Sequence, residues 1–314
     1  MSRATSSRPV AWAAVLALAL TLPACDTSAE SHPAQPESVA IAGVTVSREP
    51  GLHDGLPAAV KDSGVVRVAT DVPYPPFEMF EGAGSRRITG LDYDLGQAIA
   101  TKLGVRFDFT ATKFDSIIPS IQAGKFDVVM SAMTDTKERQ QVLTFVDYSA
   151  SGSGILVAKG NPERISTLID LCGRAVAAQS GTKQAELLQE DSPCPKAGKP
   201  DVQLSVFPKD ADAQLAIKSG KVIADFMDKP AGGYLALTAE GGTAFELIDD
   251  AQYPNGVDAT PNGIGVAKSQ GGLPDSIQRA LQALMDEGSY HRILEHYGQQ
   301  GIAISKATIN AAVG

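Results

Sequence analysis

Hydroxyl-bearing side chains and an arginine follow one short apolar stretch of the chain. Residues 126–130, FDVVM, are predicted to form a buried strand, and Ser131, Thr134 and Arg139 come soon after it. In open α/β sheets, ligands bind beyond the carboxyl ends of strands, next to the N–H groups of helix N-termini. The guanidinium of Arg139 can hold a carboxylate with two parallel hydrogen bonds. The pattern therefore predicts a binding site for a carboxylate.

The same residues also allow a simpler interpretation. Lys137–Val142 can form a helix that begins at Asp135 or Thr136. Arg139 would then be a solvated charge on a surface helix. The rest of the chain favours the binding site.

A carboxylate that can accept an ammonium group follows another predicted strand. Asp228 comes after Val222–Met227 and directly before Lys229 and Pro230, which can open a helix. Asp228 can cap that helix, accept a cation from a ligand, or do both.

Asp71 and Tyr74 lie in a loop that is predicted to be rigid. Val65–Ala69 has the pattern of a strand, and the loop that follows, TDVPYPPFE, contains three prolines. Proline fixes the backbone angle φ and removes a hydrogen-bond donor, so neither a strand nor a helix can continue there. The loop can therefore hold both side chains toward a ligand with little ordering on binding.

A glycine turn supplies further hydrogen-bond donors. Arg174–Gln179 is predicted to be a strand, and Gly181 and Thr182 follow it before a predicted helix, Lys183–Gln189. Backbone N–H groups at such a turn can hold an anion.

Strands and helices alternate around these residues. The first predicted strands are Val65–Ala69, Val105–Thr110, 126–130 and Thr144–Tyr148, with helices over Leu95–Leu103 and Phe114–Ala123. This order calls for a mostly parallel sheet. The alternation resumes at Ile155 after a crossover at 151–154, and the chain returns through a second crossover near 253–262. We therefore expect an α/β protein of two lobes joined by two crossover hinge strands, with the ligand between the lobes.

The N-terminus has the features of an export signal. Arg3 and Arg8 precede an apolar segment, Pro9–Leu22, which is too short to span a bilayer. The sequence from Leu22 to Cys25, LPAC, resembles a bacterial lipobox, which predicts a lipid anchor on Cys25. The alternative is a plain signal peptide that is cut near Ala24.

Cysteine usage agrees with export. The chain has three cysteines, and if Cys25 carries lipid, Cys172 and Cys194 can form a disulfide in an oxidising compartment. The net charge is −9, and no basic block is longer than a dipeptide, which disfavours a nucleic-acid partner. The histidines are scattered, so neither a metal site nor a cofactor is predicted.

These signals divide the chain as follows. We expect a signal peptide (1–24), a flexible tether after the lipidated cysteine (25–60), a first lobe (61–150 plus 259–300), a second lobe (151–258) and a C-terminal tail (301–314). The alternative for part of the tether is an ordered strand around Val39–Val46.

Several stretches together resemble one protein family. TDVPYPPFE, GLDYDLGQAIATKLG, FDSIIPSIQAGKFDVVMSAMTDTKERQQVLTF, AVAAQSGTKQ and EGSY are similar, in order and spacing, to the family 3 solute-binding proteins, and the likeness runs from about Val65 to Gly298. These are receptors of ABC importers for polar amino acids. The resemblance implies the two-lobed periplasmic-binding-protein type II fold.

The resemblance also implies a role for each candidate residue. The α-carboxylate of an amino acid would bind Arg139, helped by the backbone at Ala132 and by Gly181 and Thr182. The α-ammonium would bind Asp228, helped by Ser131 or Thr134, while Asp71 and Tyr74 would face the ligand's side chain. The chain departs from the family at Leu91, where an aromatic residue is usual, and at Ala132, where serine is common.

The predicted function is high-affinity binding of a polar L-amino acid outside the cytoplasm, and Asp71 favours a basic or amide side chain on that ligand. Closure of the lobes would deliver it to the transmembrane subunits of an ABC permease, and we expect a membrane-anchored monomer. The alternative is a cyclohexadienyl or arogenate dehydratase-like enzyme on the same scaffold, in which a carboxyl of the cleft would act as a general acid.

Overall fold

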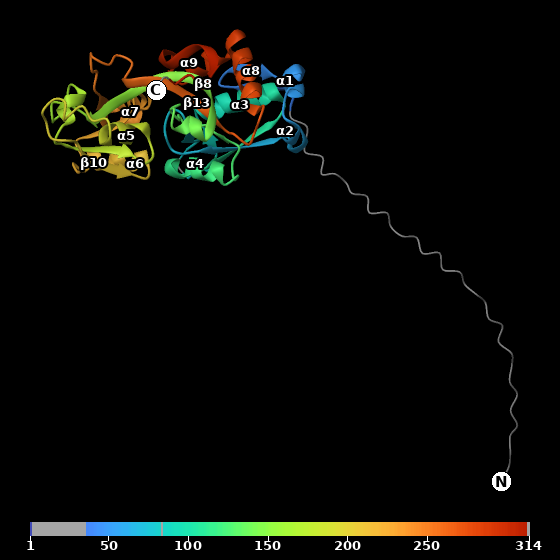
Figure 1. Ribbon diagram of the computed structural model, residues 1–314, viewed down its shortest axis with the longest axis horizontal. Coiled ribbons are helices and arrows are strands. Elements are labelled where there is room, and N and C mark those ends of the chain that lie inside the picture. Colours follow the sequence, from blue (N-terminus) through green and yellow to red (C-terminus); the bar gives the residue numbers. More distant parts are fainter. Residues whose placement is uncertain (2–35, 83, 313–314) are drawn as a thin grey trace. The chain divides into compact units, whose positions relative to one another are not determined.

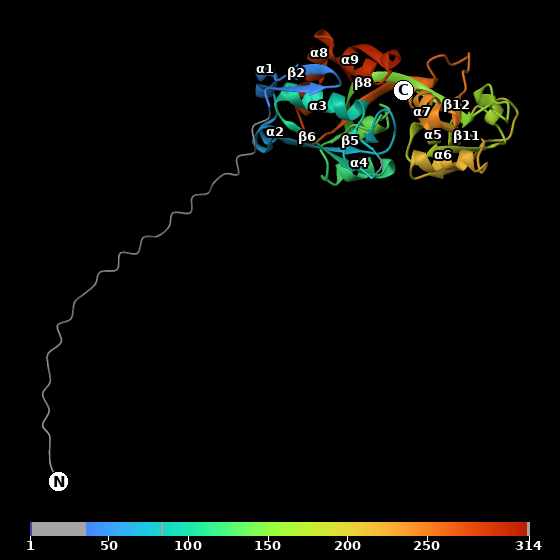
Figure 2. The same cartoon turned by 180° about the vertical axis from the view of Figure 1, so that it is seen from behind.

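The computed structural model describes residue 1 and residues 36–82 and 84–312. The predicted signal peptide and Cys25 lie outside the described residues. Among the residues described, no helix is long and apolar enough to cross a membrane. The folded body is shown from two sides in Figures 1 and 2.

The first lobe has a parallel sheet at its centre. Strand β3 (Val65–Thr70) lies between β6 (Arg106–Ala111) and β7 (Val128–Val129) and is parallel to both. Helices α3 (Leu91–Leu103) and α4 (Phe114–Gln122) connect these strands, and a short hairpin, β4 (Met79–Phe80) with β5 (Ile88–Thr89), precedes α3. Helix α3 ends at Gly104, whose φ of 65° is left-handed and therefore favours glycine.

The second lobe repeats this arrangement. Strand β9 (Ala175–Gln179) is parallel to β10 (Gln203–Phe207) and to β11 (Ala224–Asp228). The helices of this lobe are η2 (Leu168–Leu171), α5 (Lys183–Gln189), α6 (Asp210–Lys218), α7 (Lys229–Thr238) and η3 (Ala239–Gly242), and β12 (Phe245–Leu247) pairs with the hinge. Both lobes are thus mostly parallel α/β units, as predicted.

Two long antiparallel strands join the lobes into one sheet. They are β8 (Leu143–Ala158) and β13 (Val257–Ala267), and the sheet order is β10-β9-β11-β8-β13-β7-β3-β6. The strands predicted at Thr144–Tyr148 and from Ile155 onward are one continuous strand, β8, which passes through the predicted crossover at 151–154. At the crossing, a Cβ on Gly152 would lie 2.4 Å from the backbone of Gly256, so only glycines allow the strands to approach so closely.

The helix predicted over Lys137–Val142 is reduced to one 3₁₀ turn, η1 (Arg139–Gln141). The hydroxyl of Thr136 accepts a hydrogen bond from the Arg139 N–H at 3.1 Å, and the chain then enters β8. A helix start is therefore present, as the sequence predicted, but the hinge strand begins before a second turn can form.

Part of the predicted tether is folded. Residues 36–60 contain a hairpin, β1 (Ser38–Ile41) with β2 (Val44–Ser47), and helix α1 (Pro50–Asp54), and α2 (Ala58–Ser63) follows. The apolar side chains of Ile41, Val44 and Val46 are buried in the main core. The hairpin lies beside α3 and α9 (Figure 2), so the alternative of an ordered segment around Val39–Val46 replaces the tether there.

The predicted C-terminal tail also belongs to the fold. After α8 (Leu273–Asp286), α9 (Ser289–His296) and η4 (Gln300–Ile302), strand β14 (Ala303–Ile309) pairs with β8. The carboxylate of Asp147 accepts hydrogen bonds from the Thr308 hydroxyl at 2.9 Å and the Ala311 N–H at 3.1 Å. The segment predicted as a C-terminal tail is therefore part of the fold, since it covers one edge of a hinge strand.

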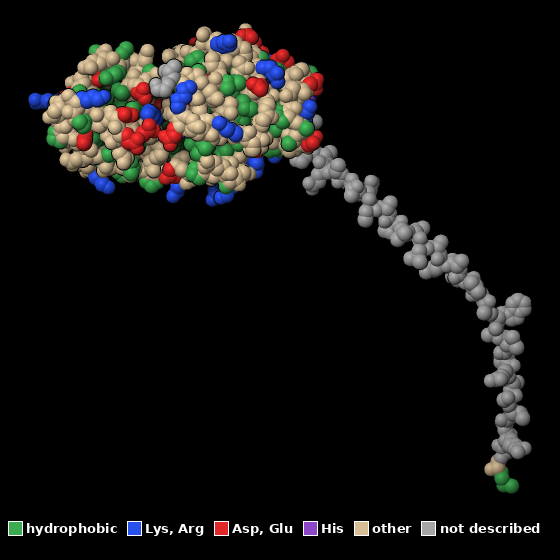
Figure 3. Space-filling view, in the orientation of Figure 1, with side chains coloured by type: hydrophobic (Ala, Val, Ile, Leu, Met, Phe, Trp, Pro, Cys, Tyr) green, Lys and Arg blue, Asp and Glu red, His purple; other side chains and the backbone are tan. Residues whose placement is uncertain are grey.

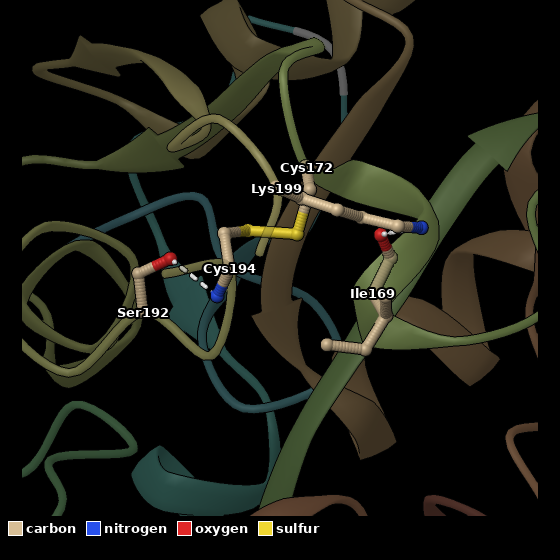
Figure 4. Close-up of a disulfide and its surroundings, with 5 residues drawn as sticks. All are labelled: Ile169, Cys172, Ser192, Cys194 and Lys199. Carbon is tan, nitrogen blue, oxygen red and sulfur yellow. Dashed lines mark hydrogen bonds between the residues drawn. A yellow bond between two sulfur atoms is a disulfide. The ribbon is translucent and has the colours of Figure 1, made fainter. Parts of the chain in front are cut away.

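The predicted disulfide is present in the second lobe. Cys172 and Cys194 are joined with a sulfur–sulfur distance of 2.02 Å, and 22 positions separate them in the sequence (Figure 4). The bond ties the end of η2 to the segment that follows α5.

We expect the double variant Cys172→Ser, Cys194→Ser to be less stable by about 3 kcal/mol, because a disulfide across a loop of this length restricts the unfolded chain. The melting temperature should then fall by about 6–12 °C in calorimetry. Ligand affinity should change little, since neither cysteine lines the cavity described below. Equal melting temperatures for the variant and the oxidised wild type would contradict this prediction, and reduced wild type is the matched control.

Candidate binding site between the lobes

A narrow cavity of about 20 Å³ lies between the lobes. The first lobe contributes Asp71, Tyr74, Glu78, Phe114, Ser131, Ala132, Thr134 and Arg139 to its lining, and the second contributes Gln179, Thr182, Lys183, Gln184 and Asp228. Most of the residues singled out in the sequence therefore meet in one place.

Arg139 reaches across the boundary between the lobes. Its guanidinium donates to the carbonyl of Thr134 at 2.8 Å and to the carbonyl of Gly181 at 3.0 Å, and it lies 5.7 Å from the ring centre of Phe114. These bonds use two of the five N–H donors of the guanidinium. Burial lowers the pKa of Arg139, while Glu186 and Asp228 act in the opposite direction. The side chain is thus not a solvated surface charge.

Asp228 stands at the carboxyl end of β11 and faces the same cavity. It accepts a hydrogen bond from the Tyr74 hydroxyl at 2.8 Å and from the Gln184 amide at 3.2 Å. Its carboxylate makes no capping bond to α7, which excludes helix capping as its role in this structure. Burial raises the pKa of Asp228 to about 6, with Asp210 adding to the effect.

Asp71 also bridges the lobes. Its side chain accepts hydrogen bonds from Gln179 and Lys209 of the second lobe, and its backbone N–H donates to the Ser131 hydroxyl at 2.9 Å. Burial raises the pKa of Asp71, and the ammonium of Lys209 opposes this shift. Asp71 and Tyr74 therefore hold the lobes together from the loop that the prolines make rigid.

Glu78 is a cavity residue that the sequence analysis missed. It is 1% exposed, its Oε1 accepts from the Ser131 hydroxyl at 2.5 Å, and its Oε2 has no hydrogen-bond partner among the described residues. Burial raises its pKa well above the ordinary range, and Asp92 adds to the shift. The signal was available, because Glu78 ends the proline loop that carries Asp71 and Tyr74.

Phe114 supplies an aromatic surface that was expected to be missing. Leu91 stands where relatives usually have an aromatic residue that contacts the ligand. It does not line the cavity, because it is fully buried at the start of α3. Its prediction as a ligand contact is wrong, because its side chain belongs to the core of the first lobe. Phe114 instead begins α4 and brings its ring to the cavity beside Arg139.

The backbone donors predicted for a carboxylate are partly occupied. The N–H of Ala132 donates to the Asp92 carboxylate at 2.7 Å, so Ala132 lines the cavity without a free backbone donor. The carbonyl of Gly181 accepts a hydrogen bond from Arg139. A Cβ on Gly181 would lie 3.0 Å from the backbone of Asp115 in the other lobe. The hydroxyl of Thr182 caps α5 by accepting from the Ala185 N–H at 3.2 Å.

Two α/β lobes that enclose a charged cavity and are joined by two hinge strands define a two-lobed receptor for small solutes. Residues 66–300 match the bacterial extracellular solute-binding proteins, family 3. The chain belongs to this family, which confirms the predicted family and fold class.

Several relatives share most of their length with this chain. It is 27% identical to the arginine-binding protein ArgT of Corynebacterium glutamicum, over 94% of this chain and 93% of that protein. It is also 27% identical to the ABC transporter arginine-binding protein 1 of Escherichia coli, over 75% of this chain and 91% of the relative.

Two solved structures of reconstructed ancestral proteins are also similar. An ancestral arginine-binding protein bound to arginine has 33% identity and a TM-score of 0.65, with 75% of this chain and 98% of that one covered. AncCDT-1, an ancestral amino acid-binding protein described as a precursor of cyclohexadienyl dehydratase, has 31% identity and a TM-score of 0.66, with 76% and 97% covered. These relatives are named as binding proteins, in agreement with the prediction that this chain is not an enzyme.

Proposed function

We propose that the protein binds a free amino acid with a cationic side chain, arginine first among them, and presents it to an ABC permease. The observation that carries the proposal is the meeting of Arg139 from one lobe and Asp228 from the other in one buried cavity. A zwitterion needs one cation and one anion that are both withdrawn from water, and each must be paired when buried.

Arg139 would take the α-carboxylate. Its guanidinium keeps donors beyond those used by Thr134 and Gly181, and a charge-assisted pair with a carboxylate is stronger than a neutral hydrogen bond. Asp228 would take the α-ammonium, with Tyr74 and Gln184 fixing its orientation. The roles of Ser131 and Thr134 toward the ammonium stay predictions.

The remaining carboxyls favour a cationic side chain. Asp71, which Lys209 contacts, and Glu78 line the cavity in addition to Asp228. The cavity cation Lys183 is already paired with Glu186 at 2.7 Å. The Oε2 of Glu78 is buried and has no hydrogen-bond partner among the described residues, so it would accept from a guanidinium or ammonium. The rings of Tyr74 and Phe114 can pack against the ligand's carbon chain. The names of the two curated relatives agree with this choice.

An acidic groove outside the cavity supports the same charge preference. It shares Lys183 with the cavity. Its charged lining residues are two lysines, Lys137 and Lys183, and five carboxyls, Asp135, Glu138, Glu186, Asp191 and Asp258. Figure 3 shows acidic side chains gathered near the middle of this face of the folded body. Such a surface raises the local concentration of cations.

Closure of the lobes about β8 and β13 would be the signal that a permease reads. Tyr74 and Asp71 contact the second lobe only when the lobes are together, so a ligand that bridges Arg139 and Asp228 shifts the population toward that state. The transmembrane subunits of an ABC importer are the partner that this proposal requires.

Isothermal titration of the protein from residue 26 onward against the common amino acids tests the proposal. We expect arginine to bind with micromolar or tighter affinity, lysine or histidine to bind more weakly, and acidic amino acids not to bind. Absence of heat with every amino acid, or turnover of prephenate or arogenate, would contradict it. Glu78→Gln should weaken arginine more than glutamine, because a bound cation favours the ionised form of Glu78 and an amide cannot ionise.

We also propose that Cys25 carries a lipid that holds the receptor at the outer face of the cytoplasmic membrane. The support is the apolar segment followed by LPAC. Mass spectrometry of the protein from the membrane fraction should find diacylglyceryl cysteine at the new N-terminus. A Cys25→Ser variant should be found in the soluble fraction. An unmodified Cys25 in the cleaved wild-type protein would contradict the lipid anchor.

A further inference from the structure

One residue outside the cavity forms an ion pair with a carboxylate inside it. The ammonium of Lys209 contacts Oδ1 of Asp71, while the Gln179 amide donates to Oδ2 of the same carboxylate. The side chain of Asp71 is 4% exposed and that of Lys209 is 30% exposed. Asp71 therefore meets polar partners of the second lobe at both oxygens, and one of them is a full positive charge.

The position of Lys209 makes this contact a product of lobe closure. Lys209 directly precedes α6, and its ammonium also donates to the carbonyl of Val72 at 3.1 Å. Among the ion pairs between described residues, Lys209–Asp71 is the one that joins the two lobes. The second lobe also brings carboxyls to this region: Asp210 and Asp228 both raise the pKa of Tyr74, and Asp71 raises the pKa of Asp210.

We propose that Lys209 is a specificity-determining residue, a built-in cation that occupies Asp71 and limits how strongly the site prefers a charged ligand side chain. This inference rests on the proposed function and deepens it. A carboxylate that already pairs with an ammonium offers a second cation less attraction, and the ammonium itself repels that cation at close range. A neutral side chain of the same shape is not affected in this way.

The Lys209 side chain has two effects on ligand binding, and they differ in which ligands they affect. As a bond between lobes, Lys209 stabilises the closed form and so favours every ligand equally. As a positive charge at Asp71, it disfavours only ligands whose side chain is cationic. The first effect changes both affinities equally, so it cancels in the ratio of the affinities for a cationic ligand and its neutral isostere. The second effect changes only one of the two affinities and therefore remains in the ratio.

Arginine and citrulline are such a pair, because they differ by one group at the distal end and carry different charge. Titration calorimetry should show that Lys209→Met raises the preference for arginine over citrulline by about tenfold or more, even if both ligands bind more weakly. Lys209→Gln should act in the same direction and serves as a second neutral variant. Lys209→Arg keeps the charge and should leave the ratio within about threefold of the wild type.

A double-mutant cycle locates the effect at Asp71. In an Asp71→Asn background, Lys209→Met should change the ratio by less than about threefold, because the carboxylate that the ammonium covers is gone. A ratio that is unchanged in Lys209→Met while both affinities fall together would overturn the proposal and leave Lys209 as a bond between lobes.

Failure of the proposed function gives a different result. If the wild type binds citrulline or glutamine but not arginine, the proposed preference for cations is wrong, yet Lys209→Met should still gain arginine binding. Absence of that gain would overturn this inference as well. A wild type that binds neither ligand overturns the proposed function and this inference with it.

Discussion

Arg139→Ala is expected to weaken the binding of every α-amino acid severely. The guanidinium is the cavity cation held by carbonyls from both lobes, Thr134 and Gly181, and its loss would leave a ligand carboxylate buried without a partner. Removing one partner of a buried, hydrogen-bonded charge pair costs about 2–5 kcal/mol. Affinity should therefore fall by about 30- to 5000-fold, measured by titration calorimetry with arginine.

The matched control for this variant is Arg292→Ala, which removes an exposed arginine of α9. Arg139→Lys is a second useful variant, because an ammonium keeps the charge but cannot form the two parallel hydrogen bonds. We expect Arg292→Ala to bind like the wild type and Arg139→Lys to bind weakly. Affinity of Arg139→Ala within threefold of the wild type would remove Arg139 from the site.

Asp228→Asn is expected to weaken binding of arginine by about 10- to 150-fold, which corresponds to about 1.5–3 kcal/mol for a hydrogen bond to a charged group. The asparagine side chain has the same shape and can still accept from Tyr74, so the change removes the charge and keeps the cavity. The test compares Asp228→Asn with Asp225→Asn, a buried carboxyl of the same strand that does not line the cavity. Equal affinities for wild type and Asp228→Asn would assign the ammonium to another group.

The same carboxyl predicts a pH dependence of binding. Burial raises the pKa of Asp228 to about 6, so the ligand-free group is protonated below that pH, whereas an ammonium needs the ionised form. The dissociation constant should therefore rise as pH falls through about 6, and Asp228→Asn should lose this component. The stability of the ligand-free protein has the opposite pH dependence. A raised carboxyl pKa contributes stability at low pH that is lost as pH rises through about 6.

The sequence by itself determined the elements whose signals are local. The stripe of Leu95, Ile99 and Leu103 with Gly104 after it predicted α3, which ends at that glycine, and the count of cysteines predicted the Cys172–Cys194 bond. Residues at the carboxyl ends of strands, such as Asp71 and Asp228, were found because a strand's end is visible in the sequence and opens toward the ligand side of a sheet.

Tertiary structure decided what depends on two distant segments meeting. Leu91 belongs to the core and Phe114 to the cavity, a distinction that neither residue's neighbours in the sequence encode. Lys209 reaches Asp71 only because β8 and β13 bring the lobes together. Residues 36–60 and the C-terminal strand have weak patterns of their own and are ordered by the surfaces on which they pack. The spacing of apolar residues within a segment predicts which helix or strand it forms. The partners of a side chain across a cleft depend on how the whole chain is arranged.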